Sequence, residues 1–241
     1  METLNIEQKE TYIGIMESAG NNLLTARGGC GKTYLTAKII LAKAKEDCYI
    51  TIVAPSHTAR SVLEKELTTQ CDGDPLWNGA RDKIETMTVA SALGKRPDFS
   101  KAPKSYKDTP FTTSKDGGKL RDNCPKDKNR LLVVEEISMV GKDEMESIFH
   151  QWGKAPILMV GDFRQIPPVN NVSSRALLAK KYKSGALEHF KLVVNERSSK
   201  DTDIALYSDI IFNTFNKDFA GVGTPHRGVF EYDNAEAFDQ T

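Results

Sequence analysis

The sequence predicts an α/β fold in which a parallel sheet is flanked by helices. A short apolar strand that begins at Leu23 leads through a glycine-rich turn into an amphipathic helix over 32–45. Continuous apolar runs over 48–54, 131–134 and 156–160 each end in polar residues. Such runs are typical of central parallel strands, which are buried on both faces. A chain of 241 residues is long enough to bury a substantial core around this sheet.

Composition argues against several classes of protein. The 33 basic and 33 acidic residues cancel, so any site for a polyanion must be local. The four cysteines are scattered and no histidine cluster accompanies them, which argues against a zinc site and for a reducing compartment. No apolar run approaches the roughly 18 residues that span a membrane, and the first residues show no secretory pattern. We expect no membrane partner and a cytoplasmic protein, in the host cytoplasm if it is phage-encoded.

Residues 4–20 predict a helix at the start of the chain. Asn5 is a candidate N-cap, and Gln8 stands three residues later in the capping-box position. Two roles for Gln8 stay open with equal weight at this point. One is the cap, and the other is a hydrogen bond to a base edge beside the glycine-rich turn.

The glycine-rich turn over 26–33 matches the phosphate-binding P-loop, except that Ala26 replaces the usual first glycine. Its three glycines allow several backbone N–H groups to converge on one anion, which also meets the positive end of the following helix dipole. The loop residues that we expect to bind a nucleotide are Arg27, Gly28, Gly29, Cys30 and Gly31.

Lys32 and Thr33 supply the side-chain chemistry of this loop. The Lys32 ammonium is expected to reach the β- and γ-phosphates, and the Thr33 hydroxyl to complete a Mg²⁺ shell. The alternative is a glycine-rich turn with an accidental Gly-Lys-Thr sequence. We disfavour it because the strand and the helix fall where the motif needs them.

The strand over 48–54 ends in Pro55, Ser56 and His57, which lead into a helix to about Leu67. Open α/β sheets bind ligands at the carboxyl ends of their strands. Taken alone, Ser56 and His57 are better explained as a helix cap than as ligand contacts, and both roles stay open.

The segment over 95–130 differs from the rest of the chain. It carries eleven Lys and Arg residues against five Asp residues, a local net charge of +6, with interleaved aromatics that include Phe111. An Asp-Gly turn after Phe111 predicts a β-hairpin. Basic residues with interleaved aromatics suit nucleic-acid backbone contact and base stacking. The alternative is a solvated loop.

Glu135 and Glu136 follow the apolar run over 131–134 directly. Two adjacent carboxylates at the end of a buried strand are costly unless they hold a cation or activate a water. In P-loop NTPases this Walker B position supplies the Mg²⁺ ligand and the base for the attacking water. The strand usually ends in Asp-Glu, so the extra methylene of Glu135 is expected to shift the metal contact, through a bridging water.

The remaining chain continues the same alternation. The strand over 156–160 ends in Asp162 and Gln165, a polar pair that resembles a sensor of the γ-phosphate or its water. Helices are predicted over 142–152, 173–183 and 202–215, and a last strand over 190–194. Residues 216–241 show no clear core pattern.

Taken in order, these motifs resemble the first motor domain of superfamily 1B helicases, and most closely its RecD/Dda-like branch. The segments that carry the resemblance are 4–8, 26–33, 54–57, 88–91, 135–139, 161–168 and 192–197. The likeness implies a RecA-like sheet, ATP and Mg²⁺ as cofactors, 5′–3′ polarity and single-stranded DNA as partner. RNA stays possible, because viral superfamily 1 relatives share these motifs.

The resemblance also implies roles for single residues. Gln8 contacts adenine, Gln165 couples the γ-phosphate to the nucleic acid, and Arg197 offers positive charge to the transition state. With Lys32 and Glu136, these residues complete the expected catalytic set. The residues expected to contact nucleic acid are Pro55, Ser56, His57, Ser91 and Phe111.

The sequence departs from the family pattern at Ala26, Glu135 and Ala90, where the family tends to have Gly, Asp and His. The departures at Ala26 and Glu135 put the rate of ATP turnover in doubt. The departure at Ala90 weakens only a contact with the nucleic-acid strand. The expected division is an ATP-binding domain over 1–94 and 131–215, and a basic insertion over 95–130 in place of the family's 1B subdomain. Residues 216–241 are then a linker or the start of a second motor domain.

The family's second motor domain has no counterpart after Arg197, so we expect the chain alone to be weak or inactive in unwinding. A further motor domain or a partner chain is the expected complement. A nucleic-acid-binding module that keeps ATP as a structural ligand is the competing hypothesis. A P-loop kinase is disfavoured, because the segments over 135–139 and 161–165 have no role in one.

Overall fold

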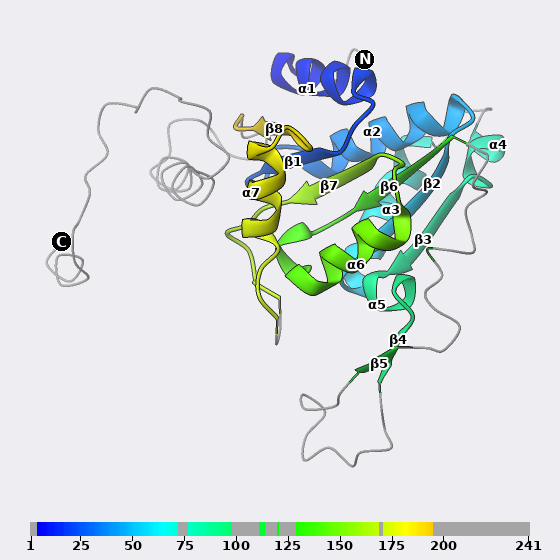
Figure 1. Ribbon diagram of the computed structural model, residues 1–241. Helices are drawn as coiled ribbons and strands as arrows, with labels where there is room; N and C mark the ends of the chain where they lie inside the picture. The colour runs from blue at the N-terminus through cyan, green and yellow to red at the C-terminus, as the bar shows by residue number, and fades with distance from the viewer. Residues whose placement is uncertain are drawn as a thin grey trace, which may run out of the picture.

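A computed structural model of the chain places a six-stranded, all-parallel sheet at the centre of the molecule (Figure 1). The structure describes residues 4–71, 77–97, 111–113, 120, 129–168 and 171–194. The strands, in sheet order, are β3 (Ile84–Thr88), β2 (Tyr49–Ala54), β6 (Arg130–Val134), β7 (Ile157–Gly161), β1 (Asn22–Ala26) and β8 (Glu188–Leu192). The predicted α/β fold with a parallel sheet is confirmed.

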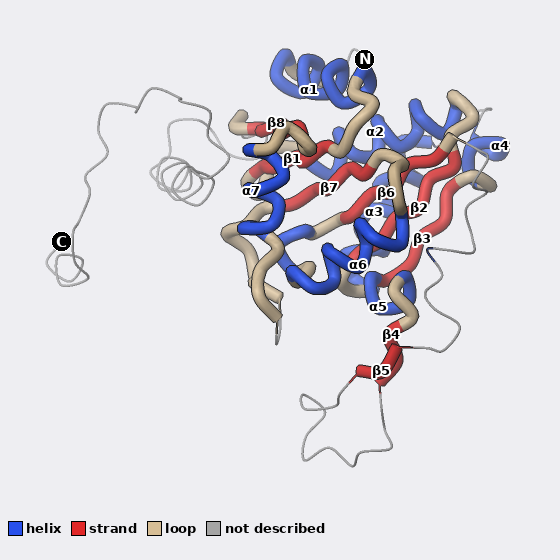
Figure 2. The backbone as a smooth tube through the Cα atoms, in the orientation of Figure 1, coloured by secondary structure: helices blue, strands red, loops and turns tan. Residues whose placement is uncertain are grey.

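Helices cover both faces of the sheet, as Figure 2 shows. The helices on one face are α1 (Ile6–Glu17), α2 (Lys32–Lys45), α3 (His57–Cys71) and α4 (Trp77–Arg81). Those on the other face are α5 (Val89–Ala92), α6 (Lys142–Trp152) and α7 (Arg175–Lys183). Two buried clusters of apolar side chains result, one on each side of the sheet. The strands between them are therefore buried on both faces, which explains their continuous apolar sequences.

The order of the strands determines which residues meet at the carboxyl edge of the sheet. β7 lies between β1 and β6, and Thr25 of β1 pairs with Gly161 at the end of β7. The loops that follow these three strands are therefore neighbours, although they lie far apart in the sequence. Ligands bind at this edge in open α/β sheets.

Helix boundaries agree with the prediction where capping signals are local. The side chain of Asn5 accepts a hydrogen bond from the Gln8 backbone N–H at 2.8 Å, and Gln8 Oε1 accepts one from the Asn5 N–H at 3.2 Å. This is the predicted capping box. Helix α6 spans the expected range, whereas α3 continues to Cys71, four residues beyond the prediction. Cys71 is buried in the core, and this burial favours the extra turn.

Two strand predictions need correction. The last strand is β8 (Glu188–Leu192), which begins and ends two residues before the predicted range of 190–194. In the basic segment, β5 (Phe111–Thr113) pairs antiparallel with β4 (Lys95–Pro97), which precedes it in the chain. The predicted hairpin turn at 116–117 lies outside the described residues.

Several expectations fall on parts of the chain outside the description. They include most of the basic insertion, the helix over 202–215, the segment over 216–241, and Arg197. The division into domains therefore stays a prediction. None of the helices in the described part of the chain has both the length and the apolar character required to cross a bilayer.

Candidate nucleotide site

The glycine-rich turn joins β1 to α2, as the P-loop motif requires. Gly29 and Gly31 adopt left-handed backbone conformations, with φ of 86° and 73°. Residues with a Cβ rarely adopt this conformation, so these two glycines allow the turn. Helix α2 begins at Lys32, and Gly31 has no side chain that caps it. The first N–H groups of α2 and the positive end of its dipole can therefore serve an anion.

Lys32 folds back over this loop. Its ammonium donates to the carbonyl of Ala26 at 3.5 Å, at the far end of the turn. The positive charge also lies close enough to Glu135 to lower the pKa of that carboxyl group, against the larger effect of burial. Lys32 thus stands between the P-loop and the end of β6, where the phosphates of a bound nucleotide are expected.

Gln8 performs the capping role and also contacts the P-loop, whereas its hydrogen bond to a base edge stays a prediction. Besides closing the capping box, its Nε2 donates to the buried carbonyl of Cys30 at 3.3 Å. A Cβ on Gly31 would lie 2.5 Å from the same Nε2 atom. Helix α1 is therefore packed directly against the loop, and Gln8 lies beside the expected nucleotide.

Cys30 is buried at the turn of the loop. Burial raises the pKa of its thiol, while a hydrogen bond with Arg27 acts in the opposite direction. Arg27 is itself buried beneath the loop. Both side chains are buried, so the groups of the loop that can bind phosphate are the backbone N–H groups of the turn.

Glu135 and Glu136 form an adjacent carboxylate pair at the end of β6, of which Glu135 is buried and Glu136 is partly buried. The burial of Glu135 raises its pKa to about 7. Lys32 lowers the pKa, and the neighbouring Glu136 raises it further. Glu136 adopts a left-handed conformation with φ of 48°, which is uncommon for a residue with a side chain.

One oxygen of each carboxylate lacks a partner. Glu135 Oε1 and Glu136 Oε2 are both inaccessible to solvent, and neither has a hydrogen bond within the described part of the chain. Buried oxygens without donors are expensive, so this pair fits a cation and a positioned water. Thr33, the second residue of α2, supplies a hydroxyl near the same edge. Oxygen ligands of this kind suit Mg²⁺, which keeps several waters and also binds phosphate.

The end of β7 is packed against the backbone that carries Glu136. A Cβ on Gly161 would lie 2.8 Å from the backbone nitrogen of Ile137 and 3.4 Å from the carbonyl carbon of Glu136. Asp162 follows, buried, and pairs with the guanidinium of Arg164. The predicted sensor Gln165 is exposed at the mouth of the site, and its backbone N–H donates to the Asp162 carbonyl at 3.0 Å.

Four of the residues expected to contact nucleic acid lie at the same edge of the sheet, after β2 and β3. Ser56 accepts from the backbone N–H of Ala59 at 3.1 Å and so caps α3, whereas His57 is exposed. Pro55 directly follows β2, and Ser91 lies in α5, whose N-cap is Thr88. Phe111 is in β5, outside the main sheet. The side chain of Phe111 and all of Arg197 lie outside the description.

Two contributors were missed from the sequence. Glu7 accepts hydrogen bonds from the backbone N–H groups of Val193 and Val194, at 2.9 and 3.0 Å, and so ties α1 to the end of β8. No local pattern reveals a contact across that much chain. Arg164 had a signal, because it follows a strand-end aspartate at a spacing of two, but its burial could not be read from the sequence.

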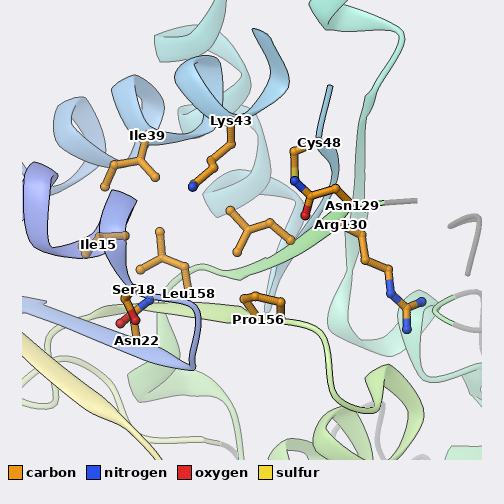
Figure 3. Close-up of a pocket in the computed structure, with 11 residues that line it drawn as sticks. Ile15, Ser18, Asn22, Ile39, Lys43, Cys48, Asn129, Arg130, Pro156 and Leu158 are labelled. Atoms are coloured by element: carbon orange, nitrogen blue, oxygen red, sulfur yellow. The ribbon is translucent and has the colours of Figure 1, made fainter. Parts of the chain in front are cut away.

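The cavity in Figure 3 lies away from this site. Its lining includes Asn22, Cys48 and Pro156, which stand at or before the amino ends of their strands. The P-loop and the carboxylate pair lie at the carboxyl ends. The cavity is therefore at the opposite edge of the sheet from the candidate nucleotide site.

Comparison with known proteins agrees with this geometry. The sequence matches the AAA domain family over residues 3–206, which is most of the chain. The chain belongs to the AAA domain family. No curated protein matches the sequence significantly.

Two solved structures of Pif1 helicase from Bacteroides share the fold of this AAA domain. A double mutant superposes with a TM-score of 0.50 at 20% identity, over 90% of this chain and 48% of that chain. A complex with ADP-AlF4 gives a TM-score of 0.51 at 17% identity, over 90% and 47%. This AAA domain therefore spans about half the length of the Pif1 chains that it matches. At these identities the likeness is one of fold.

Proposed function

We propose that this chain is the ATP-binding motor domain of a superfamily 1B helicase with 5′–3′ polarity on DNA, which couples ATP hydrolysis to the binding of single-stranded DNA. The adjacent carboxylates of Glu135 and Glu136 carry this proposal. Each has an inaccessible oxygen without a partner among the described residues, at the sheet edge that also holds the P-loop. A nucleotide with its Mg²⁺ and an attacking water satisfies both requirements of such a pair.

The proposed division of labour follows from position. Lys32 neutralises the β- and γ-phosphates, and the loop amides of 27–31 bind the same groups. Glu136 holds and activates the attacking water, and Gln165 contacts the γ-phosphate. Thr33 and Glu135 are the proposed Mg²⁺ ligands; the ion, when bound, offsets the negative charge that develops on the phosphates. Arg197 is proposed to stabilise that charge as well.

Single-stranded DNA is the proposed partner, in contact with Pro55, Ser56, His57, Ser91 and Phe111. The likeness of the motifs to superfamily 1B supports this choice, and so does the common edge at which β2 and β3 end. The RecD/Dda-like branch is part of the proposal. RNA remains the alternative nucleic acid. The buried thiols of Cys30, Cys48 and Cys71 fit the proposed cytoplasmic location.

A second motor domain, in the same polypeptide or in a partner chain, belongs to the proposal. In related NTPases an arginine supplied by a facing domain raises the rate about 10³–10⁵-fold. Gln165 and Ile166 are exposed at the edge of the sheet against which the second motor domain would pack, and Ile166 is 67% accessible. The competing hypothesis is a nucleic-acid-binding module that retains ATP without turnover.

The test is the ATPase rate of the purified chain with and without oligo-dT, with Lys32→Ala as the inactive control. We expect hydrolysis that oligo-dT stimulates and that Lys32→Ala abolishes. Nucleotide binding without turnover under both conditions would favour the module instead. Stimulation by oligo-U but not by oligo-dT would replace DNA with RNA in the proposal. Hydrolysis that survives in Lys32→Ala would refute the placement of the site.

A further inference from the structure

The strand-end aspartate Asp162 is fully engaged by one neighbouring arginine. Arg164 donates from Nε to Oδ1 at 2.9 Å and from Nη2 to Oδ2 at 2.5 Å, and its backbone N–H donates to Oδ1 at 3.1 Å. The side chain of Asp162 is 3% exposed and that of Arg164 is 12% exposed. Planar two-point pairing of a guanidinium with a carboxylate is both strong and directional. The turn after β7 is thus closed by three hydrogen bonds to one carboxylate.

This turn begins next to the backbone that carries Glu136. It begins at Gly161, whose backbone is so close to Glu136 and Ile137 that a Cβ could not be accommodated without movement. β7 itself lies between the P-loop strand β1 and β6, which carries the carboxylate pair. A shift of the turn would therefore displace the backbone of Glu136, the residue proposed to hold the attacking water.

The same turn carries Gln165. In the described part of the chain, the backbone N–H of Gln165 donates to the Asp162 carbonyl, while the residue itself is exposed. Nothing in its own packing directs the carboxamide toward a phosphate. Its position is set by the turn that supports it, and that turn is closed by Arg164.

From this geometry we infer that Arg164 is a positioning residue of the proposed ATPase: through Asp162 it fixes the turn that aims Gln165 at the γ-phosphate and supports Glu136. The inference rests on the proposed function. Both oxygens of Asp162 accept from Arg164, so this aspartate serves as the anchor of the turn, and the base and metal roles fall to Glu136 and Glu135. Arg164 itself touches no reacting group.

The experiment compares Arg164→Ala and Arg164→Lys with Arg130→Ala as a matched control. Arg130 is also a partly buried arginine, but it donates to the Trp152 carbonyl at 3.0 Å and lies over the Trp152 ring, at the amino edge of the sheet. Loss of either arginine removes packing and hydrogen bonds. Only the loss of Arg164 is expected to change the chemistry at a temperature where all variants are folded.

For Arg164→Ala we expect kcat to fall about 10- to 100-fold, the scale of a catalytic group displaced by about 1 Å. KM for ATP should rise by a smaller factor, because the contact of Gln165 with the γ-phosphate is lost. Arg164→Lys should remain impaired, because an ammonium cannot pair with both carboxylate oxygens. The losses of Arg164→Ala and Gln165→Ala should be less than additive in the double variant, because part of the effect of Arg164 acts through Gln165. Folded Arg164→Ala with kcat within twofold of the parent, or additive losses in the double variant, would overturn the inference.

A binding measurement separates this inference from the proposed function. Affinities for ADP and for a non-hydrolysable ATP analogue are measured for each chain. The parent and Arg130→Ala should prefer the triphosphate, whereas Arg164→Ala should bind ADP as the parent does and lose the preference. A parent chain that binds both nucleotides but never hydrolyses ATP would refute the motor function alone, and the preference would still decide the role of Arg164. A parent without nucleotide affinity would overturn both.

Discussion

At the scale of single residues, the adjacent carboxylates of Glu135 and Glu136 have different surroundings. Glu135 is buried, and its pKa is raised to about 7. Glu136 begins the turn after the strand in a left-handed conformation. A residue held in a sparsely populated conformation is kept there by its surroundings, and such positions cluster at functional sites. The two carboxylates are thus suited to a metal ion and a water, respectively.

The first prediction concerns Glu136→Gln. The substitution keeps the size of the side chain but removes a base, so ATP binding should be retained while turnover falls about 10²-fold or more. Steady-state ATPase assays and an equilibrium binding assay measure the two effects. Turnover within a factor of two of the parent would transfer the role of base to Glu135.

The second prediction concerns the pH dependence of stability. The pKa of Glu135 is about 7 in the folded chain and about 4.5 in the unfolded chain, so between these values only the folded chain binds the proton. The free energy of unfolding should therefore fall as pH rises from about 4.5 to 7. Glu135→Gln should remove this decline and raise stability at pH 8, by on the order of 3 kcal/mol.

Urea unfolding at pH 5 and pH 8 measures this effect, with Glu188→Gln as the control for an exposed carboxylate on β8. The control should follow the parent. Mg²⁺ competes with the proton on Glu135, so Mg-ATP affinity of the parent should rise between pH 6 and 8, and that of Glu135→Gln should not. Equal pH profiles for parent and Glu135→Gln would refute the buried-charge explanation.

At the scale of elements, α1 acts as a clamp between the P-loop and the edge of the sheet. Gln8 donates to Cys30 in the loop, and the preceding Glu7 accepts from two backbone N–H groups just after β8. Further along the helix, Gly14 is packed against the ring of Phe190 on β8. The first helix therefore fixes the position of the nucleotide loop relative to the last strand of the sheet.

The third prediction tests this packing with two glycines of the same loop. Gly31→Ala places a Cβ 2.5 Å from Gln8 Nε2 at a φ of 73°, and should lower the free energy of unfolding by at least about 1–2 kcal/mol. Gly28→Ala meets no atom within 4 Å and should leave stability nearly unchanged. Thermal or urea unfolding without nucleotide makes the comparison. Equal losses for the two variants would contradict the clamp.

The elements show which features the sequence predicts well. The strands at the centre of the sheet were found because burial on both faces leaves an unbroken apolar run. β8 was placed two residues late, because it is an edge strand whose first residue, Glu188, is exposed, and an apolar pattern is then a poor guide to pairing. Helix α3 was ended too early at Leu67, because the polar residues before the buried Cys71 hid its last turn.

The candidate site was predictable to the extent that it is written in consecutive residues. The P-loop and the carboxylate pair each occupy one short segment, so their chemistry and their place at a strand end could be inferred. The clamp by Glu7 joins residues from opposite ends of the described chain, and the pairing of Asp162 with Arg164 depends on burial. The spacing of residues along the sequence predicts neither the contact of Glu7 nor the pairing of Asp162 with Arg164.

At the scale of the whole molecule, charge is distributed unevenly. The chain as a whole is neutral, whereas residues 95–130 carry a net charge of +6. The described strands of this segment, β4 and β5, form their own two-stranded sheet, apart from the central one (Figure 1). Leu120 of the same segment is buried in the central core. The segment is therefore anchored to the domain at Leu120.

The fourth prediction concerns this charge. Replacing lysines by glutamine while keeping Leu120 should weaken single-strand binding and flatten its dependence on salt. Each lost phosphate contact should reduce the slope of log affinity against log salt by roughly 0.7. The lysines to replace are Lys101, Lys104, Lys107, Lys115 and Lys119. Binding titrations with oligo-dT at several salt concentrations measure the slope, and an unaltered slope would return the segment to the role of a solvated loop.

The position of β1 in the sheet has a consequence for biosynthesis. Asn22 at the start of β1 pairs with Leu158 of β7 and with Glu188 of β8, so both neighbours of this early strand are made long after it. At ordinary rates of translation the delay is on the order of ten seconds. During that time an apolar strand with two unpaired edges is exposed to other chains, which is the kind of segment that chaperones bind and that aggregates. The nucleotide loop is thus synthesised long before the two strands that pair with the strand leading into it.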